Sequence, residues 1–358
     1  MNNRFSPRAL TILRRQMLAW FATNRRALPW RTSRDPYRIW IAEIMLQQTR
    51  IAAVIPYYDR FLAKFPTVES LAAARIDEVL RLWSGLGYYS RARNLQRAAQ
   101  KIVAEHAGEF PRTADAALAL PGIGHYTSAA VLSIAYDVPL AVLDGNVARV
   151  LARLGAVRGD LREPRRWRTL ANTAQQLLAP HAAGDWNQAL MELGEVICTP
   201  RNPLCVNCPI SKVCRAHALG LADRIPAPRR KRAPVKIRIA AAILRDPEGR
   251  VLLVRDPGAH DRVLFSRMWQ FPAVEVAEHA ESELTAHLAK TLGLKALTLE
   301  KLRAARHAVT YRNIDLIPFL ARVSQLPTLQ RTRILPLDRL SSVPVSSATR
   351  KIAAALQK

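Results

Sequence analysis

Four cysteines, the only ones in the 358-residue chain, lie within seventeen residues: Cys198, Cys205, Cys208 and Cys214. Thiols this close together in a large chain are typical of a metal centre rather than of a disulfide framework. Structural zinc usually takes two C-x2-C pairs separated by a longer loop, whereas the spacing here is C-x6-C-x2-C-x5-C. A compact four-thiolate loop suits a cubane cluster better. We therefore expect a 4Fe-4S cluster, with zinc as the alternative.

The charge of the chain indicates a polyanionic partner. Fifty-four Lys and Arg residues stand against 28 Asp and Glu residues, which gives a formal net charge of +26. Such an excess favours DNA, because neutralising phosphates releases condensed counterions. A merely soluble, highly charged surface is the alternative. The chain has no run of eighteen apolar residues, so we expect no membrane span.

The chain is expected to divide at a basic, proline-rich stretch, residues 223–236. This linker is either a plain spacer or a segment that also contacts the DNA backbone. Residues 1–222 have few glycines and carry apolar residues three or four apart, which predicts a helical domain that begins with a helix over 7–21. Residues 237–358 are expected to form a smaller α+β domain. Its strands are expected at 237–244, 251–254 and 314–323, and its helix at 281–292.

Residues 120–124, Leu-Pro-Gly-Ile-Gly, form a turn between two helical stretches, 114–119 and 126–136. Gly122 and Gly124 would let the backbone approach an anion closely, and the following helix offers free N–H groups at the positive end of its dipole. Such a helix–hairpin–helix binds a DNA phosphate without reading sequence. A plain connector is the alternative, but the charge and the cysteine loop favour DNA binding.

Five segments together resemble a known family. LPGIG at 120–124, LDGNVARVL at 143–151 and the loop 198–214 are similar to the endonuclease III superfamily of DNA glycosylases. WIAEIMLQQT at 40–49 and WSGLGYYSRARNL at 83–95 resemble its adenine DNA glycosylase branch, the MutY family. The resemblance implies a mainly α catalytic domain, a six-helix barrel with a helix–hairpin–helix beside an iron–sulfur module. It also implies a monomeric, cytoplasmic, nucleoid-associated bacterial enzyme, with an organellar location as the open alternative.

Two carboxyl groups fit the cleavage of an adenine–deoxyribose bond, which needs a proton donor and an anion that faces the cationic sugar. Glu43 lies in an apolar helical run, 39–46, where desolvation would keep it protonated, so that it can protonate the five-membered ring of adenine. Asp144 precedes a helix over 147–154, whose amides would favour the ionised form that stabilises the sugar. An exposed helical Glu and a simple N-cap Asp are the alternatives; the motif matches favour catalysis.

The resemblance also implies that the enzyme is monofunctional. Related glycosylases that cleave the DNA backbone carry a Lys two residues after the glycine turn, as a Schiff-base nucleophile. This chain has Tyr126 there, which has no amine. Tyr126 and Asn146 are expected to position water or Asp144, and the product is expected to be an abasic site.

Base extrusion requires a wedge and a pocket. Gln48 and Tyr88 match the wedge positions of the family: Tyr88, beside the flexible residues 85–87, can stack between bases, and Gln48 can hydrogen-bond a base edge. A core aromatic is the alternative for Tyr88, and Trp30 could equally belong to the core. The residues expected to line the adenine pocket are Arg26, Leu28, Trp30, Arg31, Leu46, Ile51 and Gln188.

Residues 237–358 resemble the MutT (Nudix) module with which this family recognises 8-oxoguanine opposite the adenine. Phe271-Pro272 and Arg306-His307 match it, whereas the dense glutamate cluster of MutT hydrolases is missing around 274–294. We therefore expect no nucleotide hydrolysis. At the recognition loop, Val309-Thr310-Tyr311 replaces Phe-Ser-His. Thr310 keeps a hydroxyl for the purine edge, but its changed neighbours leave the preference for 8-oxoguanine over guanine open.

The sequence thus predicts an enzyme that removes adenine opposite 8-oxoguanine or guanine in duplex DNA. Removal of thymine or uracil from mismatches with guanine is an alternative that gives no reason for Glu43. A non-catalytic iron–sulfur protein that binds mismatches is another, and Glu43 together with Asp144 argues against it. The cluster is expected to be structural, because four thiolates leave no open position for substrate. It would hold a loop whose cations face phosphates: Arg201, Lys212 and Arg215.

Overall fold

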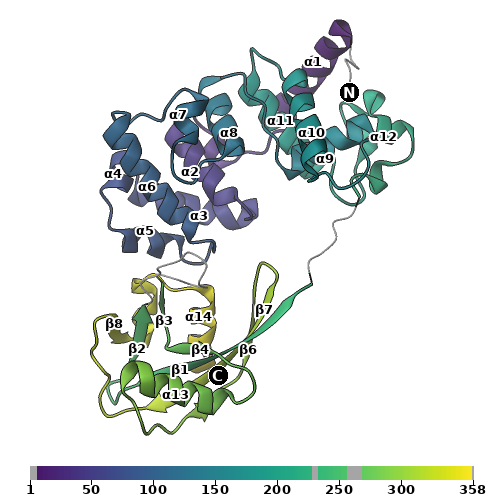
Figure 1. Cartoon of the computed structure of the whole chain (residues 1–358). Coiled ribbons are helices and arrows are strands. Elements are labelled where there is room, and N and C mark those ends of the chain that lie inside the picture. Colours follow the sequence, from purple (N-terminus) through teal and green to yellow (C-terminus); the bar gives the residue numbers. More distant parts are fainter. Residues whose placement is uncertain (1–5, 228–232, 256–267, 357–358) are drawn as a thin grey trace. The chain divides into compact units, whose positions relative to one another are not determined.

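The computed structural model describes residues 6–227, 233–255 and 268–356 (Figure 1). The chain forms two compact units. The first takes Met1–Ala72 and Arg97–Arg230, and the second takes Ala73–Gln96 and Lys231–Lys358. The segment 73–96 thus groups with the C-terminal residues. The domain boundaries expected around 223–236 stay a prediction, because residues 228–232 lie outside the described part.

Helices build the first unit, as the sequence predicts. The longer ones are α1 (Pro7–Asn24), α2 (Pro36–Leu46), α3 (Ile51–Lys64), α6 (Ser90–Glu105, which begins in the second unit), α8 (His125–Tyr136), α9 (Gly145–Gly155), α10 (Pro164–Leu177) and α11 (Ala183–Val196). The short ones are η1 (Pro29–Arg31), α4 (Val68–Ala72), α7 (Ala114–Leu118), η2 (Cys205–Asn207), η3 (Ser211–Val213), α12 (Arg215–Ala218) and η4 (Ala222–Arg224).

Local chemistry sets where the site-bearing helices begin. Asp35 caps α2 by accepting a hydrogen bond from the Tyr37 amide, and Pro36 occupies the first helical position. Asp144 caps α9 by accepting from the Val147 amide. A side-chain oxygen at this position satisfies one of the free N–H groups that a helix leaves at its start. An aspartate that caps the helix therefore fixes where α2 and α9 begin.

Close packing brings α2, α8, α9 and α11 together. Residues 39–45 of α2 are buried without interruption, and α2 and α11 both pack on α8. Two glycines of α11 permit the approach: a Cβ at Gly184 would lie 2.5 Å from the Ser133 carbonyl oxygen, and one at Gly194 would lie 2.8 Å from the Asn146 Cβ. Neither distance is sterically possible, so α11 needs glycine at both places.

The glycine turn joins α7 to α8, as predicted. Gly122 has φ +78°, the left-handed region that favours glycine. Gly124 instead has φ −103° and caps α8, and a Cβ added there would meet nothing within 4 Å. The two glycines therefore serve different purposes: Gly122 makes the turn, and Gly124 leaves open space at the start of α8.

A mixed sheet forms most of the second unit (Figure 1). The strand order is β3-β2-β1-β7-β5, with β4, β6 and β8 paired to β1, β7 and β2. Its elements are α5 (Ile76–Trp83), β1 (Val235–Arg245), β2 (Arg250–Arg255), β3 (Trp269–Gln270), β4 (Ala273–Glu275), α13 (Ala280–Leu292), β5 (Glu300–Lys301), β6 (Ala305–Val309), β7 (Arg312–Arg322), β8 (Thr332–Pro336), η5 (Leu337–Ser342), α14 (Ser347–Ala353) and η6 (Ala354–Leu356).

Both faces of this sheet are covered. Along β1, Ile237, Ala241 and Ile243 join the cluster packed on α14, whereas Ala240, Ala242 and Leu244 join the cluster packed on α13. This alternation follows from the two-residue period of a strand. The expected fold class, a mainly helical region followed by a smaller α+β module, is confirmed. Among the helices that the structure describes, none combines the length and apolarity required to cross a bilayer.

Candidate active site

One cavity of the first unit, about 790 Å³ in volume, gathers the predicted catalytic residues Glu43, Tyr126, Asp144 and Asn146. This volume lies within the usual range of small-ligand sites. The residues predicted to line the adenine pocket all line the same cavity, and so does the predicted wedge residue Gln48: Arg26, Leu28, Trp30, Arg31, Leu46, Ile51 and Gln188. The two carboxyl groups on which the chemistry depends therefore open onto one space.

Glu43 lies on α2 with 6% of its surface exposed, among apolar neighbours. Burial raises the pKa of Glu43 from 4.5 to about 7. The Tyr126 hydroxyl donates a hydrogen bond of 2.9 Å to Oε2 and opposes this rise, as does the charge of Arg31, whereas Asp144 adds to it. A carboxyl group with this pKa is about half protonated at pH 7, so a substantial fraction can act as a general acid there.

Tyr126 lies in the first turn of α8, where its hydroxyl reaches both Glu43 Oε2 and the Met191 Sδ, the latter at 3.3 Å. Burial raises the pKa of Tyr126 well above its ordinary value, and the neighbouring carboxyl groups raise it further. Tyr126 is therefore a neutral hydrogen-bond donor in this site. Its contact with Glu43 fixes one carboxyl oxygen and leaves the other for a ligand.

Asp144 caps α9, where its Oδ1 accepts a 2.7 Å hydrogen bond from the Val147 amide. The backbone amides of Val147 and Asn146 lower its pKa, as the sequence predicts for a helix start. Burial outweighs them, however, so the pKa of Asp144 lies above its ordinary value. The amides oppose the cost of burying the anion but do not overcome it.

Asn146 belongs to a network that links α9 to α11. Its Nδ2 donates to Glu195 Oε1 at 3.4 Å, and its Oδ1 accepts from Arg149 at 2.9 Å. The guanidinium of Arg149 also donates to the carbonyl oxygens of Gly194 and Cys198, at 2.7 and 2.8 Å. The amide of Asn146 is therefore held from two sides at the wall of the cavity.

Glu192 organises the other wall, and sequence reasoning missed it. Its carboxylate accepts from Arg26 Nε at 2.6 Å and from Arg31 at 2.8 Å, with 1% of the side chain exposed. Gln188, one turn earlier on α11, accepts from Arg31 Nε at 3.2 Å. The spacing of Gln188 and Glu192 was the available signal, because residues four apart share one helix face.

Trp30 satisfies both interpretations that the sequence left open. It lines the cavity, yet only 8% of it is exposed and its ring meets Tyr58 edge-on at 5.4 Å. A core residue can thus form one side of a binding site. Met191 and Glu195 also line the cavity and were not foreseen.

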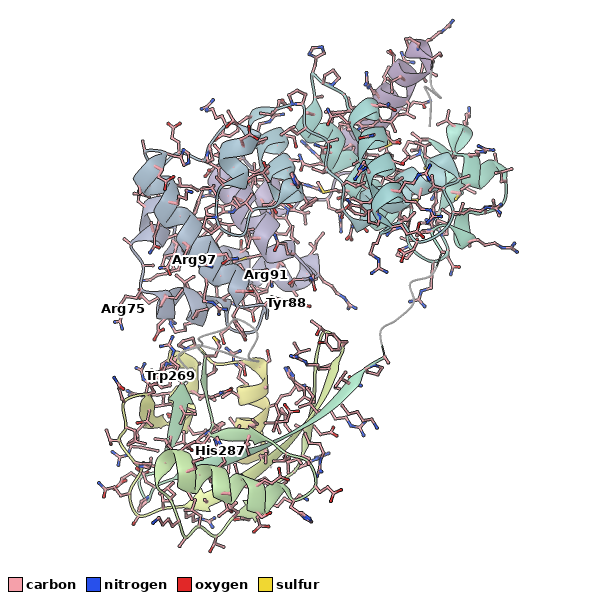
Figure 2. All side chains as sticks on the ribbon, viewed as in Figure 1. Arg75, Tyr88, Arg91, Arg97, Trp269 and His287 are labelled. Carbon is pink, nitrogen blue, oxygen red and sulfur yellow. The ribbon has the colours of Figure 1, made fainter. Side chains whose placement is uncertain are left out.

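The three side chains expected to contact DNA bases share a backbone feature. Gln48, Tyr88 and Thr310 have φ of 57°, 48° and 57°, in the left-handed region that residues other than glycine rarely adopt. All three are exposed, and 39% of Tyr88 is accessible, so the core-aromatic alternative for Tyr88 is wrong (Figure 2). Strained backbone of this kind often accompanies function.

The four cysteines lie in the short elements from α11 to α12, all of them partly exposed. Arg153 donates to Cys198 Sγ at 3.2 Å and to the Thr199 carbonyl at 2.7 Å. Burial raises the pKa of the Cys208 thiol, and the other three cysteines raise it further. The loop cations Arg201, Lys212 and Arg215 are exposed, as expected.

Comparisons with known proteins show the family of this chain. The HhH-GPD superfamily of base excision DNA repair proteins matches residues 41–176. The chain is 34% identical to the adenine DNA glycosylase of Mus musculus, in a match that covers 96% of this chain and 77% of the mouse protein. The chain belongs to the adenine DNA glycosylase family. It is therefore a DNA glycosylase of base excision repair, an enzyme that acts on DNA.

Two further similarities define how far the likeness extends. The adenine DNA glycosylase of Rattus norvegicus is 48% identical over 58% of this chain, although that match covers 42% of the rat protein. A thermostable thymine-DNA glycosylase of known structure is 32% identical, with a TM-score of 0.54 over 59% of this chain and 97% of its own. The fold of the catalytic region is thus shared by glycosylases that differ in the base they remove.

Proposed function

We propose that this glycosylase hydrolyses the N-glycosidic bond of adenine paired with 8-oxoguanine or guanine, by extruding the base and protonating it. The observation that supports this most is the shared cavity of Glu43 and Asp144. Burial gives Glu43 a pKa of about 7, and the Tyr126 hydroxyl anchors one of its oxygens. A thymine leaving group would give no use for an acid placed in this way.

In the proposed reaction, Glu43 donates its proton to the five-membered ring of the extruded adenine. The bond from the sugar to the base then breaks, and its electron pair leaves with the base. The ionised Asp144 stabilises the cationic sugar, and water adds to it while Glu43 takes back a proton. Asn146, held by Arg149 and Glu195, supports the water and Asp144 from the cavity wall.

The proposed enzyme is monofunctional. A lyase step would need an amine that attacks the sugar carbon, and Tyr126 occupies the corresponding position. Because burial keeps Tyr126 a neutral phenol, it supplies a hydrogen bond rather than a nucleophile. The expected product is an intact strand that carries an abasic site.

We assign recognition of the opposite base to the two-residue turn between β6 and β7. Val309 pairs with Arg312, so Thr310 and Tyr311 form the tip of a hairpin. The exposed Thr310 hydroxyl donates to the Val309 carbonyl at 2.6 Å and can exchange this bond for one to a purine edge. We further propose that this hairpin contacts 8-oxoguanine, that residues 223–236 are the linker before this module, and that the protein acts as a monomer.

The four cysteines fit a 4Fe-4S cluster. Their spacing, C-x6-C-x2-C-x5-C, departs from the two C-x2-C pairs of a usual structural zinc site. Within the described ranges, no group of three or more His, Cys, Asp or Glu side chains is placed to hold a single metal ion, so the proposal rests on this spacing and on the family. Cys198, Cys205, Cys208 and Cys214 would hold the cluster, and Arg153 would offset their negative charge. The bound cluster would supply a rigid scaffold for the loop.

Duplexes that each contain one mismatch test this proposal. The purified protein is incubated with adenine opposite 8-oxoguanine, adenine opposite guanine, thymine opposite guanine and uracil opposite guanine, with and without alkali. We expect cleavage only of the adenine strand and only after alkali. Cleavage at thymine or uracil would favour the second activity, which the thymine-DNA glycosylase likeness raises. Retarded mobility without any cleavage would indicate a binding protein.

A further inference from the structure

The turn that precedes Tyr88 has an unusual backbone. Three of the four residues from Gly85 to Tyr88 have positive φ: 115° at Gly85, 73° at Gly87 and 48° at Tyr88. Glycine adopts such angles without cost, but Tyr88 does not. Nothing lies within 4 Å of a Cβ added at Gly87, so no side chain packs against the turn at that position. Other contacts must hold Tyr88 in place.

Arg91, the second residue of α6, supplies such contacts. Its guanidinium donates to the carbonyl oxygens of Leu86 at 3.3 Å and Gly87 at 3.2 Å. The same guanidinium lies 5.4 Å from the ring centre of Trp83 and 5.4 Å from that of Tyr88. The Trp83 indole N–H also donates to the Gly87 carbonyl, at 3.2 Å. Figure 2 shows Arg91 and Tyr88 next to each other.

The burial of these residues differs in an instructive way. Arg91 has 9% of its surface exposed, whereas Tyr88 has 39% exposed. Burial lowers the pKa of Arg91 to about 10, so the guanidinium remains charged at neutral pH. A desolvated cation against an aromatic face and two carbonyl oxygens is held more strongly than the same contacts in water. Arg91 is thus a fixed support beneath an aromatic side chain that stays accessible.

We propose that Arg91 is a positioning residue that holds Tyr88 in its left-handed, half-exposed conformation before DNA binds, so that the wedge is formed in advance. The inference deepens the proposed function and rests on it, because Tyr88 acts as a wedge only if a base is extruded. Forming the wedge in advance removes the cost of ordering it during extrusion. Lysine is not equivalent here, because its ammonium group lacks the planar guanidinium that lies against the Trp83 and Tyr88 rings while its Nη2 donates to both carbonyl oxygens.

The test compares Arg91→Lys with the parent protein on two duplexes. One carries 2-aminopurine in place of adenine opposite 8-oxoguanine, and the other carries it opposite an abasic analogue, where little pairing has to be broken. The fluorescence increase of 2-aminopurine reports extrusion without requiring cleavage. We expect Arg91→Lys to slow extrusion about tenfold on the paired duplex and less than about twofold on the other. Equal slowing on both would show a merely structural role and overturn the proposal.

Two further variants keep the test decisive. Arg93→Lys is the matched control, because Arg93 is a similarly buried arginine (7% exposed) on the same helix; it should not discriminate between the duplexes. Trp83→Phe removes the indole N–H but keeps a ring, so it should show the same defect on the paired duplex, only smaller. It takes the place of Arg91→Lys in the test if Arg91→Lys fails to fold. In a Tyr88→Ala background, Arg91→Lys should add nothing; an additive loss would contradict the proposal.

The design separates this inference from the proposed function. If the parent protein extrudes 2-aminopurine but leaves adenine uncleaved, the proposed reaction fails while the role of Arg91 is still measured. If it cleaves adenine and Arg91→Lys slows both duplexes equally, the proposed reaction stands and the role of Arg91 fails.

Discussion

The cavity of the first unit buries its reactive side chains, whereas the β6–β7 hairpin of the second unit presents its side chains to solvent. Glu43 is 6% exposed and its pKa is raised to about 7, while Thr310 is exposed and its hydroxyl donates to the carbonyl of its neighbour Val309. In the proposed function, burial alters the chemistry of Glu43, and exposure leaves the Thr310 hydroxyl available to the opposite base. Changes in the cavity should therefore affect rate, and changes at the hairpin should affect preference.

The largest effect is expected for Glu43→Gln. The substitution keeps the size and hydrogen-bonding capacity of the side chain but removes the transferable proton, so single-turnover excision of adenine should fall by about 10³-fold. Binding to the mismatched duplex should stay within a few-fold of the parent protein, measured by fluorescence anisotropy. If excision survives in this variant, Glu43 is not the acid.

The pH dependence should show the same buried group. Glu43 must be protonated to act, so single-turnover excision should be constant just below pH 7 and fall about tenfold per unit above it. At low pH the rate should fall again as Asp144 is protonated, and this limb should lie above the ordinary Asp pKa of 3.8. A flat profile between pH 6 and 9 would place the proton transfer elsewhere.

Stability should also depend on the burial of Glu43. Between pH 4.5 and about 7, the unfolded state loses the proton and the folded state keeps it, so folding stability should decrease as pH rises through this window. At pH 8 the full shift would cost up to about 3 kcal/mol, and Glu43→Gln should recover it. Denaturant unfolding at pH 4.5 and pH 8 measures the difference. Equal gains at both pH values would mean that the benefit has another cause.

The smallest effect is expected at the hairpin. Thr310→Ala removes one exposed hydroxyl, whose hydrogen bond is worth about 1 kcal/mol, so the preference for 8-oxoguanine over guanine should fall about fivefold. The rate opposite guanine should barely change. Thr310→Ser, which keeps the hydroxyl, is the matched control and should retain the preference. A similar loss of excision rate opposite both bases would mean that Thr310 contributes to the reaction itself and not only to recognition of the opposite base.

The sequence predicted the fold well because its elements are specified locally. Apolar residues at helical spacing predicted the first unit, and the strands expected at 237–244 and 251–254 predicted the change to a sheet. The predicted cavity residues also came together. Glu43 lies in the motif 40–49 and Asp144 in the motif 143–151, each of which has a fixed place in the fold, whereas the arginines and Gln188 were placed only by the family resemblance. The motifs could not predict how burial and hydrogen bonds balance in setting the pKa of one group. Asp144 shows this, since its amide contacts were foreseeable but the depth of its burial was not.

Tertiary contacts account for the remaining omissions. Glu192 lies in no motif, and its role depends on two arginines more than 160 positions earlier in the chain. The left-handed backbone at Gln48 and Thr310 was equally hidden, because neither residue type signals that conformation. Long-range pairs and backbone strain are properties of the folded chain, so sequence pattern reaches them only indirectly.

The ionisable lining of the cavity has a consequence for where DNA comes to rest. Three arginines face four carboxyl side chains there: Arg26, Arg31 and Arg50 against Glu43, Asp144, Glu192 and Glu195. The lining of the cavity is thus close to neutral or slightly negative, although the chain as a whole has a net charge of +26. The positive surface should attract phosphates, whereas the carboxyl groups of the cavity should repel phosphates and attract a nucleobase that becomes positively charged. The charge distribution should therefore keep the phosphates of a nucleotide outside the cavity and favour entry of its base before any bond is broken.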